Sequence, residues 1–193
     1  MTKIVHEKLE NIAIIGNGGR ENSLAWAIQK NKLIKNIFLI PGNGGSGKIR
    51  KCQNLNLDYE NKNLLIQTFN SLKIDLIIIG PEIPLSKGLG DFLRSKNFQV
   101  FGPNSNGAKL ESSKSWAKSF MKEANIPTAK FWKASSVSES EKIISNAPFP
   151  LVVKADGLAS GKGVFIPETK ADTIKITKEI INGKFGESGK IVL

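Results

Sequence analysis

The chain is poor in the residues that build disulfides and metal centres. Its 193 residues contain one cysteine, Cys52, and one histidine, His6. A single cysteine excludes a disulfide within the chain and is typical of a reducing compartment. One cysteine and one histidine are also too few for the usual zinc ligand sets. We therefore expect a reduced protein without structural zinc.

Long apolar runs are also absent. No run approaches the roughly 20 apolar residues that a membrane-spanning helix needs, and residues 1–7 lack the apolar core of a signal peptide. The composition, 40% hydrophobic and 23% charged, is typical of a globular protein. The length corresponds to one or two domains. We expect a cytoplasmic protein that does not use a membrane.

Arginine is scarce although the chain is strongly basic. The formal net charge is +11, from 28 Lys+Arg against 17 Asp+Glu, yet only Arg20, Arg50 and Arg94 are arginines. Arginine is the preferred reader of bases and phosphates, and the lysines are scattered rather than gathered into a basic stripe. The pattern favours a solvated surface and no nucleic-acid partner. The positive field also suits anionic small-molecule substrates.

Strand-length apolar runs alternate with helical patterns in the first half of the chain. The run at 76–79 is continuously apolar, which is typical of a parallel strand covered on both faces. The alternation predicts an α/β fold with a Rossmann-like open parallel sheet. The predicted strands are 11–16, 37–40, 75–80 and 98–102, and the predicted helices are 20–29, 63–72 and 86–96.

The segment Gly102-Pro103-Asn104 breaks this alternation and marks a domain boundary. We predict a polar leader over 1–10, a first domain over 11–103 and a second domain over 104–193. Residues 190–193 have the pattern of a strand that has only begun, so we expect the second domain to be incomplete. Its predicted helices are 112–124, 138–146 and 169–181.

The most informative stretch is a glycine-rich loop between two Val-rich runs at 151–166. The loop carries three glycines and Lys162, and Lys154 lies on the run before it. Glycines let backbone N–H groups approach a bound group closely, and the lysines add positive charge. The pattern predicts a strand–loop–strand unit that binds a polyphosphate. The alternative is an ordinary hairpin in which Lys154 is a solvated charge on an edge strand.

A Walker A loop does not account for this segment. Gly157 and Gly161 are separated by only three residues, and Gly163 stands where the Mg²⁺-binding hydroxyl is required. The segment 42–49 contains a Gly-Lys pair but ends in Ile49, which has no hydroxyl. The sequence therefore disfavours a P-loop in both places.

A second glycine loop, 16–19, follows the first predicted strand. It matches half of the dinucleotide fingerprint Gly-x-Gly-x-x-Gly, but Glu21 replaces the third glycine. The second predicted strand ends at Ile40-Pro41 without a ribose-binding acid, which disfavours NAD. Backbone N–H groups at a helix start suit a phosphate or a carboxylate. The alternative is a tight turn that needs glycine for fit alone.

Glu82 follows the third predicted strand, at the edge where open α/β sheets bind ligands. Pro81 and Pro84 stiffen the loop around it. A carboxylate held there can bind sugar hydroxyls or an amine. The alternative is a surface glutamate in a proline-rich turn.

Taken in order, these segments resemble one family, the phosphoribosylamine–glycine ligases (glycinamide ribonucleotide synthetases) of the ATP-grasp superfamily. Asn22 departs from the His that the family usually has after Arg-Glu. The resemblance makes the second domain an ATP-grasp domain, with Lys154 as its strand lysine. The matching segments are 16–21, 41–43, 79–85, 101–103, 110–114, 126–129 and 154–164.

The resemblance implies an ATP-dependent carbon–nitrogen ligase of purine biosynthesis. It would join glycine to 5-phosphoribosylamine through glycyl phosphate, giving glycinamide ribonucleotide, ADP and phosphate, with ATP and Mg²⁺ or Mn²⁺ as cofactors. The expected ATP-binding residues are Lys114, Lys154, Gly157, Leu158, Ala159, Ser160, Gly161, Lys162 and Gly163. The expected phosphoribosylamine-binding residues are Gly18, Gly19, Arg20, Glu21, Asn43 and Glu82.

Family chains continue past residue 193, so the resemblance also implies an N-terminal fragment that is inactive alone. Metal ligands are expected beyond Leu193, no catalytic residue is assigned within the chain, and a full-length member is expected to be a monomer. Two alternatives stay open. One is another ATP-grasp ligase of purine metabolism, and the other is a non-catalytic module that binds nucleotides or nucleic acid.

Overall fold

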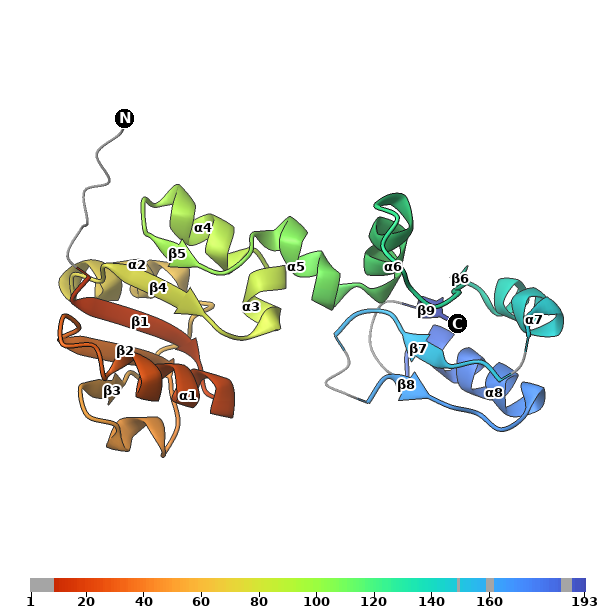
Figure 1. The fold of residues 1–193 in the computed structure, drawn as a ribbon, viewed down its shortest axis with the longest axis horizontal. Coiled ribbons are helices and arrows are strands. Elements are labelled where there is room, and N and C mark those ends of the chain that lie inside the picture. Colours follow the sequence, from red (N-terminus) through yellow and green to blue (C-terminus); the bar gives the residue numbers. More distant parts are fainter. Residues whose placement is uncertain (1–8, 149, 159–161, 185–188) are drawn as a thin grey trace. The chain divides into compact units, whose positions relative to one another are not determined.

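The computed structural model describes residues 9–148, 150–158, 162–184 and 189–193 (Figure 1). The chain divides into two compact units, Met1–Ser105 and Asn106–Leu193. Whether 11–103 and 104–193 are independent domains stays a prediction. Among the residues described, every helix is too short or too polar to cross a membrane.

The first unit is built on a parallel sheet of five strands in the order β3-β2-β1-β4-β5. This confirms the predicted α/β fold with an open parallel sheet. Because these strands are parallel, the carboxyl ends of β1, β2 and β4 lie at one edge of the sheet. The strand order reverses between β1 and β4, and such sheets bind ligands at the carboxyl edge beside this reversal. The strands are β1 (Asn11–Gly16), β2 (Asn36–Pro41), β3 (Cys52–Asn54), β4 (Leu76–Ile79) and β5 (Val100–Phe101).

The helix predicted over 86–96 is present as α4, Leu89–Ser95, but it begins three residues later, after a separate short helix α3 that ends at Ser86. Gly88 lies between them with a φ of +77°, a left-handed conformation that interrupts a helix. The three-residue strand β3 and the helix α5 were not predicted from the sequence. The helices of the first unit are α1 (Gly19–Ile28), α2 (Lys62–Ser71), α3 (Glu82–Ser86) and α4 (Leu89–Ser95), with a 3₁₀ turn, η1 (Ser46–Lys48). Helix α5 (Ser105–Ser112) begins at the last residue of the first unit and otherwise belongs to the second.

Both faces of the first sheet are covered. All residues at 12–15 of β1 and 37–40 of β2 are buried. Successive side chains of a strand point to opposite faces, so this continuous burial requires packing on both sides. On one side, Ala25 of α1 is buried in the core, with Leu24 and Ile28 packed beside it.

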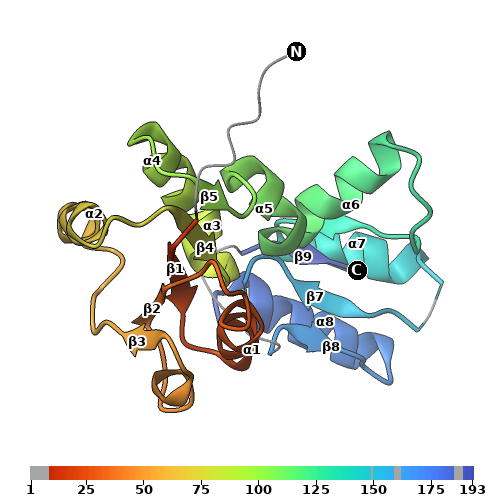
Figure 2. The same cartoon turned by 60° about the vertical axis from the view of Figure 1, so that its left-hand side comes forward.

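The second unit contains a sheet in the order β6-β9-β7-β8 with antiparallel neighbours. Helices α7 and α8 pack together and contact the sheet (Figure 2). Its β7–β8 hairpin confirms the predicted strand–loop–strand unit, and β7 lies between β9 and β8 rather than at an edge. The elements are α6 (Lys114–Glu123), β6 (Lys133–Ala134), α7 (Val137–Asn146), β7 (Val153–Ala155), β8 (Val164–Phe165), α8 (Lys170–Ile181) and β9 (Ile191–Val192).

Candidate functional site

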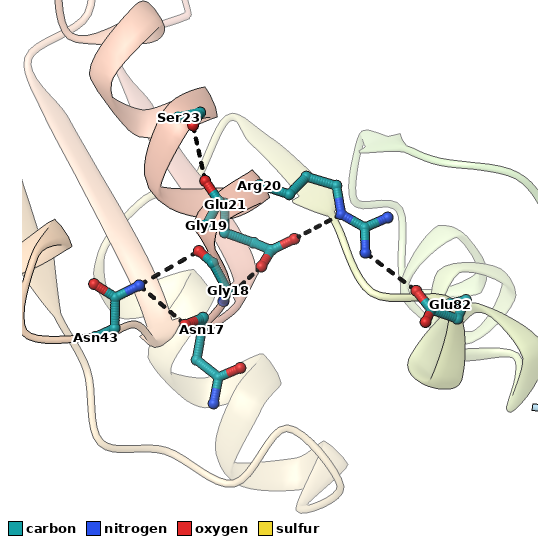
Figure 3. Close-up of polar contacts among 8 residues, drawn as sticks. All are labelled: Asn17, Gly18, Gly19, Arg20, Glu21, Ser23, Asn43 and Glu82. Carbon is teal, nitrogen blue, oxygen red and sulfur yellow. Dashed lines mark hydrogen bonds and ion pairs between the residues drawn. The ribbon is translucent and has the colours of Figure 1, made fainter. Parts of the chain in front are cut away.

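Loops that follow β1, β2 and β4 meet at the carboxyl edge of the first sheet. Figure 3 shows the predicted sugar-side residues gathered there, although they come from three separate segments. Parallel strands bring this about, because their carboxyl ends lie at the same edge. The residues brought together are Gly18, Gly19, Arg20, Glu21, Asn43 and Glu82.

Glu21 lies at the centre of this cluster and is only 2% exposed. Its Oε2 accepts a hydrogen bond of 2.7 Å from the Gly18 N–H, which ties the glycine loop to the first turn of α1. The space for its carboxylate exists because nearby residues lack side chains. A Cβ on Gly16 would lie 2.5 Å from Glu21 Cγ, and one on Gly80 would lie 2.7 Å from Glu21 Cδ.

Arg20 bridges two carboxylates. Its Nε lies 3.3 Å from Glu21 Oε1, and its Nη2 donates a hydrogen bond of 3.1 Å to Glu82 Oε2. The first contact is an ion pair without hydrogen-bond geometry, so Oε1 accepts no hydrogen bond among the described residues. The pKa of Glu82 is held below its ordinary value, first by its own backbone N–H and then by Arg20. Glu82 therefore stays ionised at neutral pH.

The side chain of Asn43 joins the loop after β1 to the loop after β2 by hydrogen bonds. Its Oδ1 accepts hydrogen bonds from the N–H groups of Gly45 and Ser46, at 2.8 and 2.9 Å. Its Nδ2 donates to the carbonyls of Asn17 and Gly18, at 2.9 and 3.4 Å (Figure 3). An asparagine side chain offers two donors and two acceptor positions, so all four are used. Its predicted contact with substrate would require one of these bonds to break.

A second polar cluster lies in the second unit, where the glycine loop leaves β7. Asp156 is 8% exposed. Its carboxylate accepts hydrogen bonds from the Ser115 N–H at 3.1 Å, from Ser115 Oγ at 2.5 Å and from the Gly157 N–H at 3.0 Å. Ser113 Oγ lies 3.3 Å away as a further donor. The start of α6 and the start of the loop are thereby tied to one carboxylate.

Opposing influences act on the Asp156 carboxyl. Burial acts to raise its pKa, but the hydrogen bonds from Ser115 and Gly157 outweigh burial and lower it below the ordinary value. The position also favours the anion, because Asp156 faces the N-terminus of α6. Asp156 is therefore a fixed negative charge at the base of the glycine loop.

The two predicted phosphate-binding lysines lie close to this loop base. Lys114, the first residue of α6, donates a hydrogen bond of 2.8 Å from Nζ to the Gly157 carbonyl. Lys154 of β7 lines a cleft of about 340 Å³ whose other walls are largely apolar. The cleft is lined by Lys118, Ala129, Lys130, Phe131, Trp132, Pro148, Pro150, Leu151, Val152, Lys154, Val192 and Leu193.

The structure covers only part of the predicted loop site. Ala159, Ser160 and Gly161 lie outside the described residues. Leu158 is partly exposed and Lys162 is exposed, whereas Gly163 is buried and its carbonyl accepts a hydrogen bond from the Ala155 N–H at 2.8 Å. Within the described ranges, no group of three or more His, Cys, Asp or Glu residues is placed to hold a metal ion.

Sequence reasoning missed Asp156 and its partners Ser113 and Ser115. The only available signal was the position of Asp156 between a strand and a glycine. Its contacts join residues more than 40 positions apart, and no local pattern predicts such a pair. The serines flank Lys114 in the sequence, and their hydrogen bonds to Asp156 fix the start of the helix that carries this lysine.

Comparison with known families matches almost the whole chain. Residues 10–111 match the family model described as phosphoribosylglycinamide synthetase, N domain. Residues 112–193 match the model described as phosphoribosylglycinamide synthetase, ATP-grasp (A) domain. The first match ends at residue 111 and the second begins at residue 112.

Individual relatives agree with the family models. The chain is 40% identical over 182 residues to a phosphoribosylamine–glycine ligase of Nostoc sp., covering 94% of this chain and 43% of that protein. It is 42% identical over 187 residues to the Clostridium acetobutylicum ligase, covering 94% and 44%. A crystal structure of the Thermotoga maritima ligase superposes with a TM-score of 0.76 at 35% identity, covering 94% and 42%. The chain thus spans less than half the length of these relatives.

Proposed function

The chain belongs to the phosphoribosylglycinamide synthetase family, and from this premise we propose that it contributes to the ATP-dependent ligation of glycine to 5-phosphoribosylamine. The products are glycinamide ribonucleotide, ADP and phosphate. ATP supplies the phosphoryl group that activates the glycine carboxylate for attack by the amine. We infer a cytoplasmic monomer that acts on small molecules and not on nucleic acid.

The arrangement around β7 carries this proposal. Lys154 lies on an inner strand, beside a cleft whose volume suits a small-molecule ligand. We assign the apolar wall of the cleft, including Val152 and Leu193, to the adenine base. Lys154 then binds a phosphate oxygen by a charge-assisted hydrogen bond. The sequence left open the alternative that Lys154 is a solvated charge on an edge strand. In the observed strand order β7 is not at an edge, because it lies between β9 and β8.

Lys114 and the loop glycines complete the proposed nucleotide site. Lys114 donates one hydrogen bond to the Gly157 carbonyl. Its ammonium group carries three N–H donors, so a nucleotide phosphate would accept from another of them without displacing that carbonyl. Asp156 keeps both the start of α6 and the loop base in place. We retain Gly157, Leu158, Lys162 and Gly163 as proposed ATP contacts.

The first unit supplies the proposed sugar site. Glu82 is ionised and fixed by Arg20, and a fixed carboxylate accepts hydrogen bonds from ribose hydroxyls or an amine. The N–H groups at the start of α1, beside Gly18 and Gly19, suit an anionic group. Mg²⁺ or Mn²⁺ is implied for the whole enzyme, but the described residues offer no ligand set for it, and we assign no metal ligand to this chain.

The reaction itself is the test. The whole gene product that carries this sequence is assayed for ADP release with ATP, 5-phosphoribosylamine and glycine, and with each omitted in turn. We expect release only when all three are present. Release that depends on bicarbonate instead of glycine would favour a carboxylase-type ligase of the same superfamily. Salt-dependent DNA binding without ATP affinity would favour a non-catalytic module.

A further inference from the structure

We propose that Glu21 is a positioning residue, whose buried carboxylate holds Arg20 so that Arg20 holds Glu82 in place for the sugar. This inference rests on the proposed function, because the sugar is assigned to Glu82 there. It changes the role of Glu21, which the sequence suggested as a direct substrate contact.

Burial separates Glu21 from any ligand. With 2% of its surface exposed, the side chain has no open face toward a substrate. A buried carboxylate is unfavourable unless hydrogen bonds and opposite charges compensate it. Here the Gly18 N–H and the Arg20 guanidinium do so, and glycines at 16 and 80 make the space. Such a site is built to hold this carboxylate.

Arg20 is the link from the buried acid to the surface. Its side chain is 61% exposed, and a long exposed arginine samples many rotamers unless something orders it. Two carboxylates from different segments contact it, Glu21 at Nε and Glu82 at Nη2 (Figure 3). Because the guanidinium is planar and rigid, the ion pair at Nε restricts the orientations that Nη2 can adopt. The position of Glu82 therefore depends on Glu21.

The same carboxylate also fixes the glycine loop. Gly18 is the N-cap of α1, and its N–H is bound by Glu21 in the first turn. Loss of the Glu21 charge therefore reaches the proposed sugar site by two routes, through the loop and through Arg20. An isolated change at Arg20 disturbs only one of them.

The ionisation of Glu82 gives a ligand-free test. The pKa of the Glu82 side-chain carboxyl is measured by ¹³C NMR in the unmodified protein, Glu21→Gln, Arg20→Ala and the control Glu60→Gln. Glu60 forms a surface ion pair with Lys87 in the same unit. We expect Arg20→Ala to raise the Glu82 pKa because it removes the hydrogen-bond donor, and Glu21→Gln to raise it because Arg20 is released. Glu60→Gln leaves it unchanged.

The direction of the Glu82 pKa shift in Glu21→Gln distinguishes the loss of Arg20 positioning from the direct effect of removing the Glu21 charge. Removing a nearby negative charge would by itself lower the pKa of Glu82. A rise in Glu21→Gln therefore requires that Arg20 has lost its hold. An unchanged or lowered Glu82 pKa in Glu21→Gln, beside a raised one in Arg20→Ala, would overturn the inference. If Glu21→Gln does not fold, the double variant Glu21→Ala/Gly80→Ala, in which a methyl group refills the vacated space, is measured in its place.

Binding of ribose 5-phosphate separates this inference from the proposed function. Calorimetry on the same proteins should show affinity reduced about tenfold or more in Glu21→Gln, as expected for loss of a charge-assisted contact. Glu60→Gln should bind like the unmodified protein. If the unmodified protein binds no ribose 5-phosphate while the NMR shifts appear, the sugar assignment fails and the positioning role stands. Binding that is unaffected in Glu21→Gln, with an unchanged Glu82 pKa, overturns the positioning role and leaves the sugar assignment intact.

Discussion

The carboxylate of Glu21 fills the space that a side chain at residue 80 would occupy. A Cβ on Gly80 would lie against Oε1 and 2.7 Å from Cδ of Glu21. The dinucleotide fingerprint has its third glycine where this chain has Glu21. In this chain the glycine is instead at residue 80, in the loop after β4 that faces Glu21. The absence of a side chain at Gly80 lets the two loops approach closely, with the carboxylate of Glu21 buried between them.

Gly80→Ala should lower the free energy of unfolding of the chain by about 1–3 kcal/mol, the range for overpacking a buried site. The added methyl group meets Glu21, which has no room to withdraw. Urea unfolding measures the effect. Gly44→Ala is the matched control, because a Cβ there has no atom within 4 Å. Its free energy of unfolding should be unchanged or slightly higher than that of the unmodified chain.

A double variant tests whether the harm done by Gly80→Ala comes from its clash with Glu21. In a Glu21→Ala background, Gly80→Ala should be much less harmful than in the unmodified chain, because neighbouring substitutions that share a clash are not additive. Equal effects of Gly80→Ala in both backgrounds would show that its harm comes from somewhere other than Glu21.

Asn43→Ala should destabilise the chain by about 1–3 kcal/mol. The substitution removes four hydrogen bonds and leaves loop N–H and carbonyl groups without their partners. Asn17→Ala is the control, because that side chain is exposed, and its effect should stay within about 0.5 kcal/mol. Urea unfolding again gives the comparison. If the two variants unfold alike, Asn43 does not anchor the loops.

Lys154→Ala in the whole gene product should weaken ATP binding by roughly tenfold to over a hundredfold, the range for losing a charge-assisted hydrogen bond. Calorimetric titration with Mg-ATP measures the dissociation constant. Lys175→Ala, an exposed lysine on α8, should bind ATP like the unmodified protein. Comparable dissociation constants for the two variants would return Lys154 to the role of a solvated charge.

Much of the fold could be predicted because burial left a clear pattern in the sequence. The strands at 12–15, 37–40 and 76–79 are continuous apolar runs, and in the structure they are the centre of the sheet. β3 could not be found in this way, since Cys52-Gln53-Asn54 is short and polar. The break at Gly88 was also invisible, because one glycine does not reveal the sign of its φ.

From sequence, candidate site residues can be proposed only where the residue type alone suggests chemistry, as for Arg20, Glu82, Lys114 and Lys154. In the structure Arg20, Glu82 and Lys114 lie in the first turn of a helix, and Lys154 lies within β7, shortly before the glycine loop. The supporting contacts were not predictable. Asn43 looked like a substrate contact, yet its hydrogen bonds are all used within the protein. Such partners are set by tertiary distance, which a single sequence does not contain.

Asp156→Asn should make the free energy of unfolding of the second unit less dependent on pH under acidic conditions. The folded pKa of Asp156 lies below its ordinary value, so its contribution to stability is full above the unfolded pKa of about 3.9. That contribution is lost as the pH falls through the folded pKa. The variant should be less stable near pH 7, because an amide cannot accept all the hydrogen bonds from Ser115 and Gly157, and should lose less stability on acidification.

Tryptophan fluorescence can follow the second unit selectively. Trp116 and Trp132 lie in that unit and Trp26 lies in the first, so urea unfolding is measured from pH 3 to 7 in a Trp26→Phe background. Trp26 is exposed, so this replacement should disturb little. Glu168→Gln, an exposed carboxylate of the same unit, should give a curve close to that of the background protein. A curve for Asp156→Asn parallel to the background, merely displaced, would show that the acid sensitivity arises elsewhere, because a group that titrates differently in the two states must change the slope with pH.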